Sequence, residues 1–173
     1  MKKVFLFMCA GLFVLSTSAQ IEAPQPSPSA KIEQKVGLTD VTLEYSRPAV
    51  RDREIFGGLV PFGEVWRTGA NANTKITFSD SVEIGGKNLA KGTYAIYTIP
   101  NKDSWEVIFY KDASNWGNPQ EWDDSKVALK ATAKVKTMPS SMESFGIFVN
   151  ELSNDGAVLD FVWSNTLATL AFK

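Results

Sequence analysis

The sequence contains no histidine, and this absence restricts its chemistry more than any other. Histidine is the usual general base of enzymes, the usual partner of a nucleophilic serine or cysteine, and the commonest ligand of transition metals. The chain has one cysteine, so a disulfide within the chain and an ordinary structural zinc site are excluded as well. Only oxygen ligands remain for a metal, and no calcium-loop spacing of acidic residues is present. We therefore predict no metal site and no cofactor.

The sequence also lacks the motifs of nucleotide chemistry and the charge of a nucleic-acid-binding protein. The glycines at 57 and 58 are not followed by the Gly-Lys-Ser/Thr of a phosphate-binding loop. No serine lies in a nucleophile-elbow pattern. The chain has 18 basic and 19 acidic residues, a balance that provides no basic surface. We predict no nucleic-acid partner.

The first 19 residues have the three-part layout of a removable secretory signal peptide. Lys2 and Lys3 precede an apolar run over 4–15, and small residues lead to a cleavage site after Ala19. The apolar run is shorter than the roughly 20 residues of a transmembrane helix, and no other long run follows. Cys9 lies inside the run, which argues against lipid attachment. We predict no transmembrane helix, export to the periplasm or the extracellular space, and a mature chain without cysteine.

The remainder divides into a short tether and one domain. Residues 20–30 contain three prolines and few apolar residues, a composition typical of an extended, Pro/Ser-rich tether. Residues 31–173 show no second linker and no repeat. A domain of this length can bury enough apolar surface to fold without disulfides.

Residues 31–173 alternate between apolar and polar side chains with the period of two that predicts half-buried β-strands. The alternation is clearest over 41–45, 76–78, 94–99, 105–110, 127–136, 145–149, 159–163 and 166–172. Turn residues lie between these runs, at 85–86, 100–103 and 154–156. We predict an all-β fold of about eight to nine strands, an antiparallel β-sandwich or a jelly-roll-like variant. One or two short helical turns are expected, at 53–59 and 120–126.

Three stretches of the chain carry a resemblance to a known family. They are residues 36–39 with 45–48, residues 56–71 (FGGLVPFGEVWRTGAN), and residues 92–100 continued by 115–117. Together they resemble the secreted bacterial proteins of the domain of unknown function 2911. The resemblance implies a signal peptide, a tether and one domain. It implies no activity, because none is assigned to the family.

The segment 47–73 is the candidate functional loop, because it is long and lacks clean alternation. Long loops in compact domains tend to be functional or disordered, and the large apolar Phe62 and Trp66 argue against disorder. Guanidinium groups bind carboxylate and similar anions through paired hydrogen bonds. An anion site is therefore predicted here, and the alternative is that the arginines pair with acidic neighbours and fix the loop to the domain. The arginines of the segment are Arg47, Arg51, Arg53 and Arg67, with Glu54 and Glu64 between them.

Amides and tryptophans add candidates for a sugar-like ligand. Asn71 and Asn73 could bind a polar ligand, or could cap a turn with their side chains. Trp116 lies with Asn118 and Trp122 in a polar loop, where the rings could stack on a sugar or could cover the end of the sandwich. The predicted ligand-binding residues are Arg47, Arg51, Arg67, Glu64, Asn71, Asn73 and Trp116.

The sequence thus predicts an exported β-sandwich module that binds a small polar or anionic ligand or a partner protein of the envelope. One alternative is an extracytoplasmic hydrolase that acts on carbohydrate with two carboxylates, drawn from Glu64, Glu121, Asp123 and Asp124. Neighbours on one loop seldom lie on opposite sides of a bond, so no catalytic residue is predicted. The other alternative is a structural protein of the envelope.

Overall fold

The computed structural model describes residues 23–173, and its fold is all-β. Nine antiparallel strands form one continuous sheet, in the order β1-β2-β3-β6-β7-β8-β9-β4-β5. The predicted fold class is therefore confirmed; the predicted signal peptide at 1–19 lies outside the described residues. The strands are β1 (Ser29–Val36), β2 (Thr39–Ser46), β3 (Thr74–Phe78), β4 (Val82–Ile84), β5 (Lys87–Leu89), β6 (Gly92–Pro100), β7 (Ser104–Tyr110), β8 (Val127–Asn150) and β9 (Ala157–Phe172).

The turns follow the predicted sequence signals. The glycines 85–86 join β4 to β5, and both have positive φ angles, 59° and 75°, which glycine adopts without steric cost. The expected helical turn at 120–126 is a 3-10 helix, η1 (Asp124–Lys126). The expected turn at 53–59 is not helical, because its amides bond to nearby loop carbonyls instead: Gly57 N–H donates to Val60 O over 2.8 Å.

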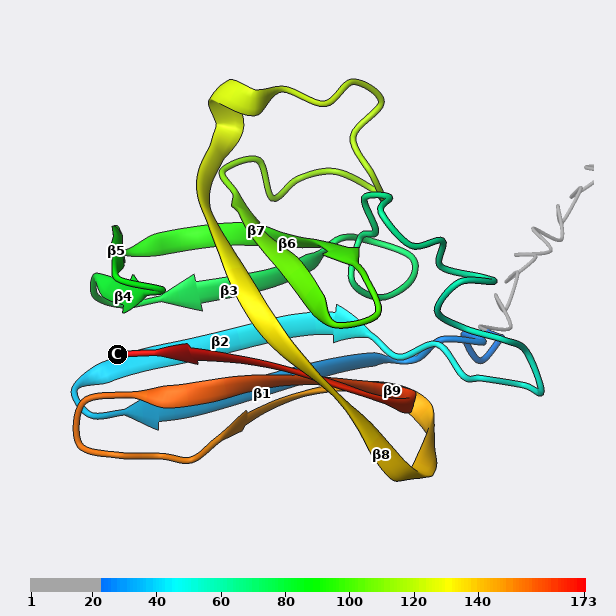
Figure 1. Cartoon of the computed structure of the whole chain (residues 1–173). Coiled ribbons are helices and arrows are strands. Elements are labelled where there is room, and N and C mark those ends of the chain that lie inside the picture. Colours follow the sequence, from blue (N-terminus) through cyan, green and yellow to red (C-terminus); the bar gives the residue numbers. More distant parts are fainter. Residues whose placement is uncertain (1–22) are drawn as a thin grey trace, which may run out of the picture.

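The last part of the chain forms two long, bent strands where the alternation predicted four shorter ones. The register between β8 and β9 shifts between Thr137 and Met142 and again before Gly146. Opposite this region, Ser164 of β9 has a φ of 52°. Figure 1 shows β8 crossing the molecule diagonally, from the long loop after β7 to a sharp bend. The sheet folds over at this bend, so the pair of strands β8 and β9 contributes to both of the layers that enclose the core.

The residues that follow β2 reach the second half of β8 and bring the two regions of the sheet together. Phe145 N–H donates to Pro48 O over 2.8 Å, and Val50 N–H donates to Glu143 O over 2.8 Å. The Tyr45 hydroxyl continues this contact, since it accepts from Ile147 N–H (3.1 Å) and donates to Ile147 O (3.3 Å). The candidate loop therefore starts from a fixed position beside β8.

The core has a large and a small part, on opposite faces of β6 and β7. The large part contains most of the buried aromatic rings, including Trp105 and Trp163. The small part consists of Ala95, Tyr97, Ile108 and Tyr110, and the loop 111–123 covers it. Strand β6 is therefore buried on both faces.

Candidate functional site

The loop 47–73 is held rigidly by its tryptophan. Trp66 exchanges backbone hydrogen bonds with Thr98 of β6, over 2.8 and 2.9 Å. Its indole ring stacks on Trp163 of β9, with ring centroids 5.7 Å apart and an interplanar angle of 17°. The indole N–H donates to Gly69 O over 3.2 Å. These contacts fix the loop to β6 and β9. Phe62, the other large apolar residue of the loop, is 37% exposed.

Three arginines of the loop line one cleft with a volume of about 290 Å³, which we call the arginine cleft. Arg51, Arg53 and Arg67 provide its charged part, and no carboxylate side chain lines it. Trp66 and Trp163 provide an aromatic wall. The remaining lining residues are Pro26, Ser27, Pro48, Ala49, Leu59, Val60, Gly69 and Ala70. The cleft thus combines positive charge with apolar surface.

The guanidinium groups bond to carbonyl oxygens and not to carboxylates. Arg53 Nε donates to Val50 O (2.9 Å), and its Nη2 donates to Ala49 O (2.6 Å). Arg67 Nη1 donates to Asn71 O over 3.4 Å. Among residues 23–173 every ion pair involves a lysine: Lys31–Glu33, Lys35–Asp40, Lys126–Asp112, Lys130–Glu106 and Lys173–Glu83. None of these arginines therefore forms an ion pair within residues 23–173.

One acidic side chain contacts the backbone at the edge of this cleft. Glu143 Oε1 accepts the backbone N–H of Arg51 over 3.0 Å. Glu143 does not line the cleft. The alternative in which the arginines pair with Glu44, Asp52, Glu54 or Glu64 does not describe the structure between residues 23 and 173.

Three of the predicted ligand-binding residues hold the end of the tether against the domain. Arg51 Nη2 donates to Pro26 O over 3.2 Å, and Asn71 Nδ2 donates to Ser27 O over 3.1 Å. The backbone N–H of Arg47 donates to Pro28 O over 2.9 Å. The Arg47 side chain points to β8 instead, where its Nε donates to Phe145 O over 2.9 Å. The side chains of Arg47 and Asn71 thus bond within the chain and do not line the arginine cleft, and the tether forms one rim of that cleft.

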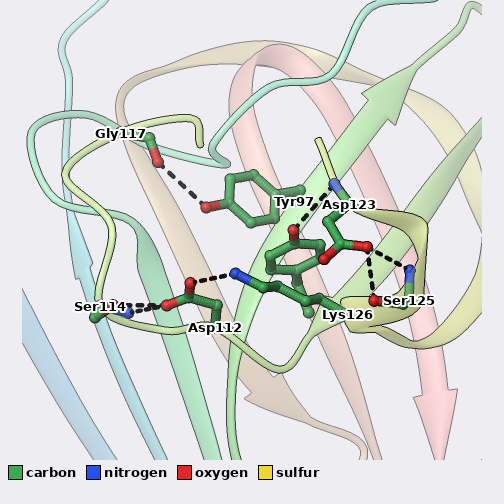
Figure 2. Close-up of polar contacts among 8 residues, drawn as sticks. Tyr97, Asp112, Ser114, Gly117, Asp123, Ser125 and Lys126 are labelled. Carbon is green, nitrogen blue, oxygen red and sulfur yellow. Dashed lines mark hydrogen bonds and ion pairs between the residues drawn. The ribbon is translucent and has the colours of Figure 1, made fainter. Parts of the chain in front are cut away.

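Asn73 holds the loop 111–123 in place through hydrogen bonds to its backbone. It is 3% exposed, and its backbone N–H donates to Asn115 O over 3.4 Å. With its amide nitrogen oriented toward that loop, the side chain also donates to the carbonyls of Asn115 (3.2 Å) and Ala113 (3.3 Å). Tyr97 supports the same loop, because its hydroxyl donates to Gly117 O over 3.2 Å (Figure 2). Burial raises the pKa of this phenol.

Acidic residues of the loop 111–123 serve as hydrogen-bond acceptors (Figure 2). Asp112 accepts from Ser114 N–H (3.2 Å) and Ser114 Oγ (2.6 Å), and it pairs with Lys126 over 3.0 Å. The bonds from Ser114 and Lys126 hold the pKa of the Asp112 carboxyl well below its usual value. Asp123 accepts from Ser125 N–H (2.9 Å) and Ser125 Oγ (2.6 Å), and these bonds lower its pKa.

The two tryptophans of this loop differ in role. Trp122 packs against Tyr97 and Tyr110, with centroids 5.5 and 4.8 Å away, and so covers the small core. Trp116 is 76% exposed and does not line the arginine cleft. The contact between this loop and the cleft is at Gly117, where a Cβ atom would lie 2.7 Å from Arg67 Nη1.

Glu64 lines a neighbouring cleft of about 340 Å³ on the other side of Arg67. Asn118 lines it as well, and its Nδ2 donates to Val65 O over 3.1 Å. The structure therefore brings Arg51 and Arg67 together in one cleft, places Glu64 next to it, and leaves Trp116 apart. Arg53 was among the arginines of the predicted anion site but not in the list of predicted ligand-binding residues. Trp163 was not predicted for the site at all, because a distant strand supplies it.

Among residues 23–173, no group of three or more cysteine, aspartate or glutamate side chains is placed to hold a metal ion. No described helix has the length and apolar character that a membrane crossing requires.

Comparison with known proteins gives one match. The model of the family described as protein of unknown function (DUF2911) matches residues 27–172. No curated protein and no solved structure matches the chain. The match begins at Ser27, the residue whose carbonyl Asn71 binds, so it includes the end of the tether that forms the rim of the cleft.

Proposed function

The chain belongs to the family of proteins of unknown function DUF2911, and from this premise we propose that it is an exported binding module for a small organic anion. The ligand is a carboxylate with an apolar or aromatic body, and it occupies the arginine cleft. Arg51, Arg53 and Arg67 bind its charged end, and the indole ring of Trp66, which stacks on the buried Trp163, contacts its body.

The observation that carries this proposal is the set of arginines in one cleft with no carboxylate partner. A guanidinium group has five N–H donors, and Arg53, which bonds most, uses its Nε and Nη2 on two carbonyls. Arg51 and Arg67 each donate one side-chain bond within the described chain. Donors therefore remain for paired hydrogen bonds to a carboxylate. Three arginines that line one cleft with no carboxylate among its lining residues favour an anion there.

The apolar wall of the arginine cleft favours a ligand that has an apolar body as well as a charged group. Small-molecule pockets usually have apolar walls with a few polar groups that fix orientation, and the arginine cleft has this composition. Its volume of about 290 Å³ lies just below the roughly 300–1,000 Å³ range of such pockets. A compact aromatic carboxylate therefore suits it better than a large ligand or a bare inorganic ion.

The proposal is tested by calorimetric titration of the exported protein with benzoate, phenylacetate, succinate and inorganic phosphate. Hydrogen bonds to charged groups contribute about 1.5–3 kcal/mol each, so Arg67→Gln should weaken benzoate or phenylacetate binding about 10- to 150-fold. Lys87→Gln is the matched control, because Lys87 is an exposed cation on β5, which Figure 1 shows far from the loop. Affinity that is equal in both variants, or no binding of either aromatic carboxylate, would overturn the proposal.

Export is the second part of the proposal, and the layout of residues 1–19 supports it. Positive residues, an apolar run and small residues follow one another as in a cleaved signal peptide. The expected location is the periplasm or the extracellular space. Amino-terminal sequencing of the protein from a bacterial host should give a chain that starts at Gln20. A chain that starts at Met1 and stays in the cytoplasm would contradict export.

No specific observation favours either alternative function, the carbohydrate hydrolase or the structural protein of the envelope. Two of the four carboxylates considered for hydrolysis are engaged locally: Asp123 accepts from Ser125, and Asp124 Oδ1 accepts the Trp122 indole N–H over 3.0 Å. Hydrolysis by two carboxylates needs the groups on opposite sides of one bond. A purely structural role accounts for the bonds of these arginines to carbonyls, but it does not require a cleft around them without a carboxylate.

A further inference from the structure

A second cleft lies on the other side of the segment 53–62 and has a volume of about 360 Å³; we call it the amide cleft. The β6–β7 turn borders it with Asn101 and Lys102, and the bend of β9 borders it with Asn165 and Thr166. Phe62 and Trp105 contribute rings to its walls. It shares no lining residue with the arginine cleft.

The amide cleft offers hydrogen bonds of both kinds and little net charge. Asn101 and Asn165 are exposed amides, each able to donate and accept. Ser164 Oγ donates to Asn165 Oδ1 over 3.1 Å, and the Asn165 amide nitrogen has no acceptor within the described part of the chain. Lys102 and Glu54 both line the cleft, so their charges cancel. This composition favours a neutral ligand with many hydroxyl groups over an ion.

Phe62 gives the cleft an aromatic face that a ligand can reach. Its side chain is 37% exposed, and its position is set by Gly57. Gly57 has a φ of 94°, and a Cβ atom at this position would lie 2.9 Å from Phe62 Cε2. Only glycine lets the ring lie this close to the backbone. An exposed ring held in place is preorganised for stacking on an apolar face of a ligand.

Two further features of the cleft wall point to a binding site. The indole N–H of Trp105 is buried, and no acceptor of residues 23–173 lies within hydrogen-bond distance. Buried donors are almost always satisfied, so this unsatisfied donor is an exception, and it belongs to a residue that lines the cleft. Ser164 has a φ of 52°, in the left-handed region that non-glycine residues seldom adopt. Backbone strain of this kind is concentrated at functional sites.

We propose that the amide cleft binds a neutral saccharide. A sugar ring has an apolar face of C–H groups and a rim of hydroxyl groups. The apolar face would stack on Phe62, and the hydroxyls would bond to the amides of Asn101 and Asn165. This site is separate from the arginine cleft, so its occupancy does not depend on the anion.

The test is calorimetric titration of the exported protein with cellobiose, maltose and N,N′-diacetylchitobiose. Saturable binding of at least one of them is expected. Phe62→Ala and Asn165→Ala should each weaken it about tenfold, the effect of losing one stacking contact or one hydrogen-bonded group. Both residues are exposed, and Phe62→Leu keeps most of the apolar volume if Phe62→Ala unfolds the protein.

Leu59→Ala is the matched control for these variants. Leu59 is an exposed apolar residue of the same segment, but it lines the arginine cleft and not the amide cleft. Its substitution should leave saccharide affinity unchanged. The proposal is overturned if none of the three saccharides binds, or if Leu59→Ala weakens binding as much as Phe62→Ala does. A failure here leaves the carboxylate titrations unaffected, so the two proposals fail separately.

Discussion

Replacing each of two buried tryptophans with phenylalanine should have unequal effects on stability. Trp105 and Trp163 are both 1% exposed and both pack against aromatic rings in the large core. Trp163 Nε1 donates to Glu143 O over 3.2 Å, whereas the indole N–H of Trp105 has no acceptor within residues 23–173. Trp→Phe removes the same atoms in both cases. The difference between the variants therefore isolates the hydrogen bond.

The expected size of this difference follows from hydrogen-bond energetics. Trp163→Phe loses a bond with a net value of about 0.5–1.5 kcal/mol and leaves the Glu143 carbonyl with one partner fewer. Trp105→Phe loses no bond and removes a buried unsatisfied donor, whose cost is about 1–3 kcal/mol. The free energy of unfolding should therefore fall further in Trp163→Phe, by roughly 2 kcal/mol or more.

Urea denaturation followed by far-ultraviolet circular dichroism measures this difference, since the midpoint of each variant is taken between its own folded and unfolded baselines. Trp105→Phe should have the higher midpoint at an unchanged m-value. In a domain of this size, roughly 2 kcal/mol corresponds to a gap in Tm of about 4–8 °C. If Trp105→Phe is as destabilised as Trp163→Phe, or more so, then the Trp105 N–H has a partner in solution and the reasoning is wrong.

Two other predictions concern the sheet and the loop 111–123. Tyr45→Phe removes the hydroxyl that bonds to both backbone groups of Ile147, so the free energy of unfolding in urea should fall by about 1–3 kcal/mol; an unchanged value would mean that β2 and β8 are held together without this contact. The depressed pKa of Asp112, caused by hydrogen bonds from Ser114 and Lys126, stabilises the fold above the unfolded carboxyl pKa of about 4. This stabilisation is lost as the pH falls through the folded-state pKa, so Asp112→Asn should lower Tm near neutral pH and approach wild type in strong acid. A difference in Tm that grows toward low pH would contradict the prediction.

The strands were predictable wherever local alternation determines burial. Each buried face of β6 could be predicted from the sequence, because Tyr94 and Ile96 alternate with Tyr97. The continuity of β8 could not, since residues 137–144 are mostly polar and include Pro139, a pattern typical of a loop. Their pairing depends on distant parts of the chain, since Met142 pairs with Ser164 of β9 and Ser144 pairs with Ala49. Such a tertiary effect leaves no local signal.

The candidate site was predictable only in part, for the same physical reason. The arginines are close in sequence, so a charged loop could be predicted from their spacing. The aromatic wall could not, because Trp163 reaches Trp66 through the folding of β9 onto the loop. The role of the tether could not be predicted from the sequence either. A Pro-rich segment carries no sequence signal for the carbonyls of Pro26, Ser27 and Pro28 that bond to the domain.

The most direct test of the arginine cleft as an anion site is nuclear magnetic resonance of the arginine Nε–Hε groups during titration with benzoate. Arg53 and Arg67 line the cleft, whereas Arg47 lies outside it with its Nε held by Phe145 O. The signals of Arg53 and Arg67 should shift in a saturable way while that of Arg47 stays fixed. If benzoate moves none of these signals, or moves that of Arg47 as much as the others, the cleft is not the binding site.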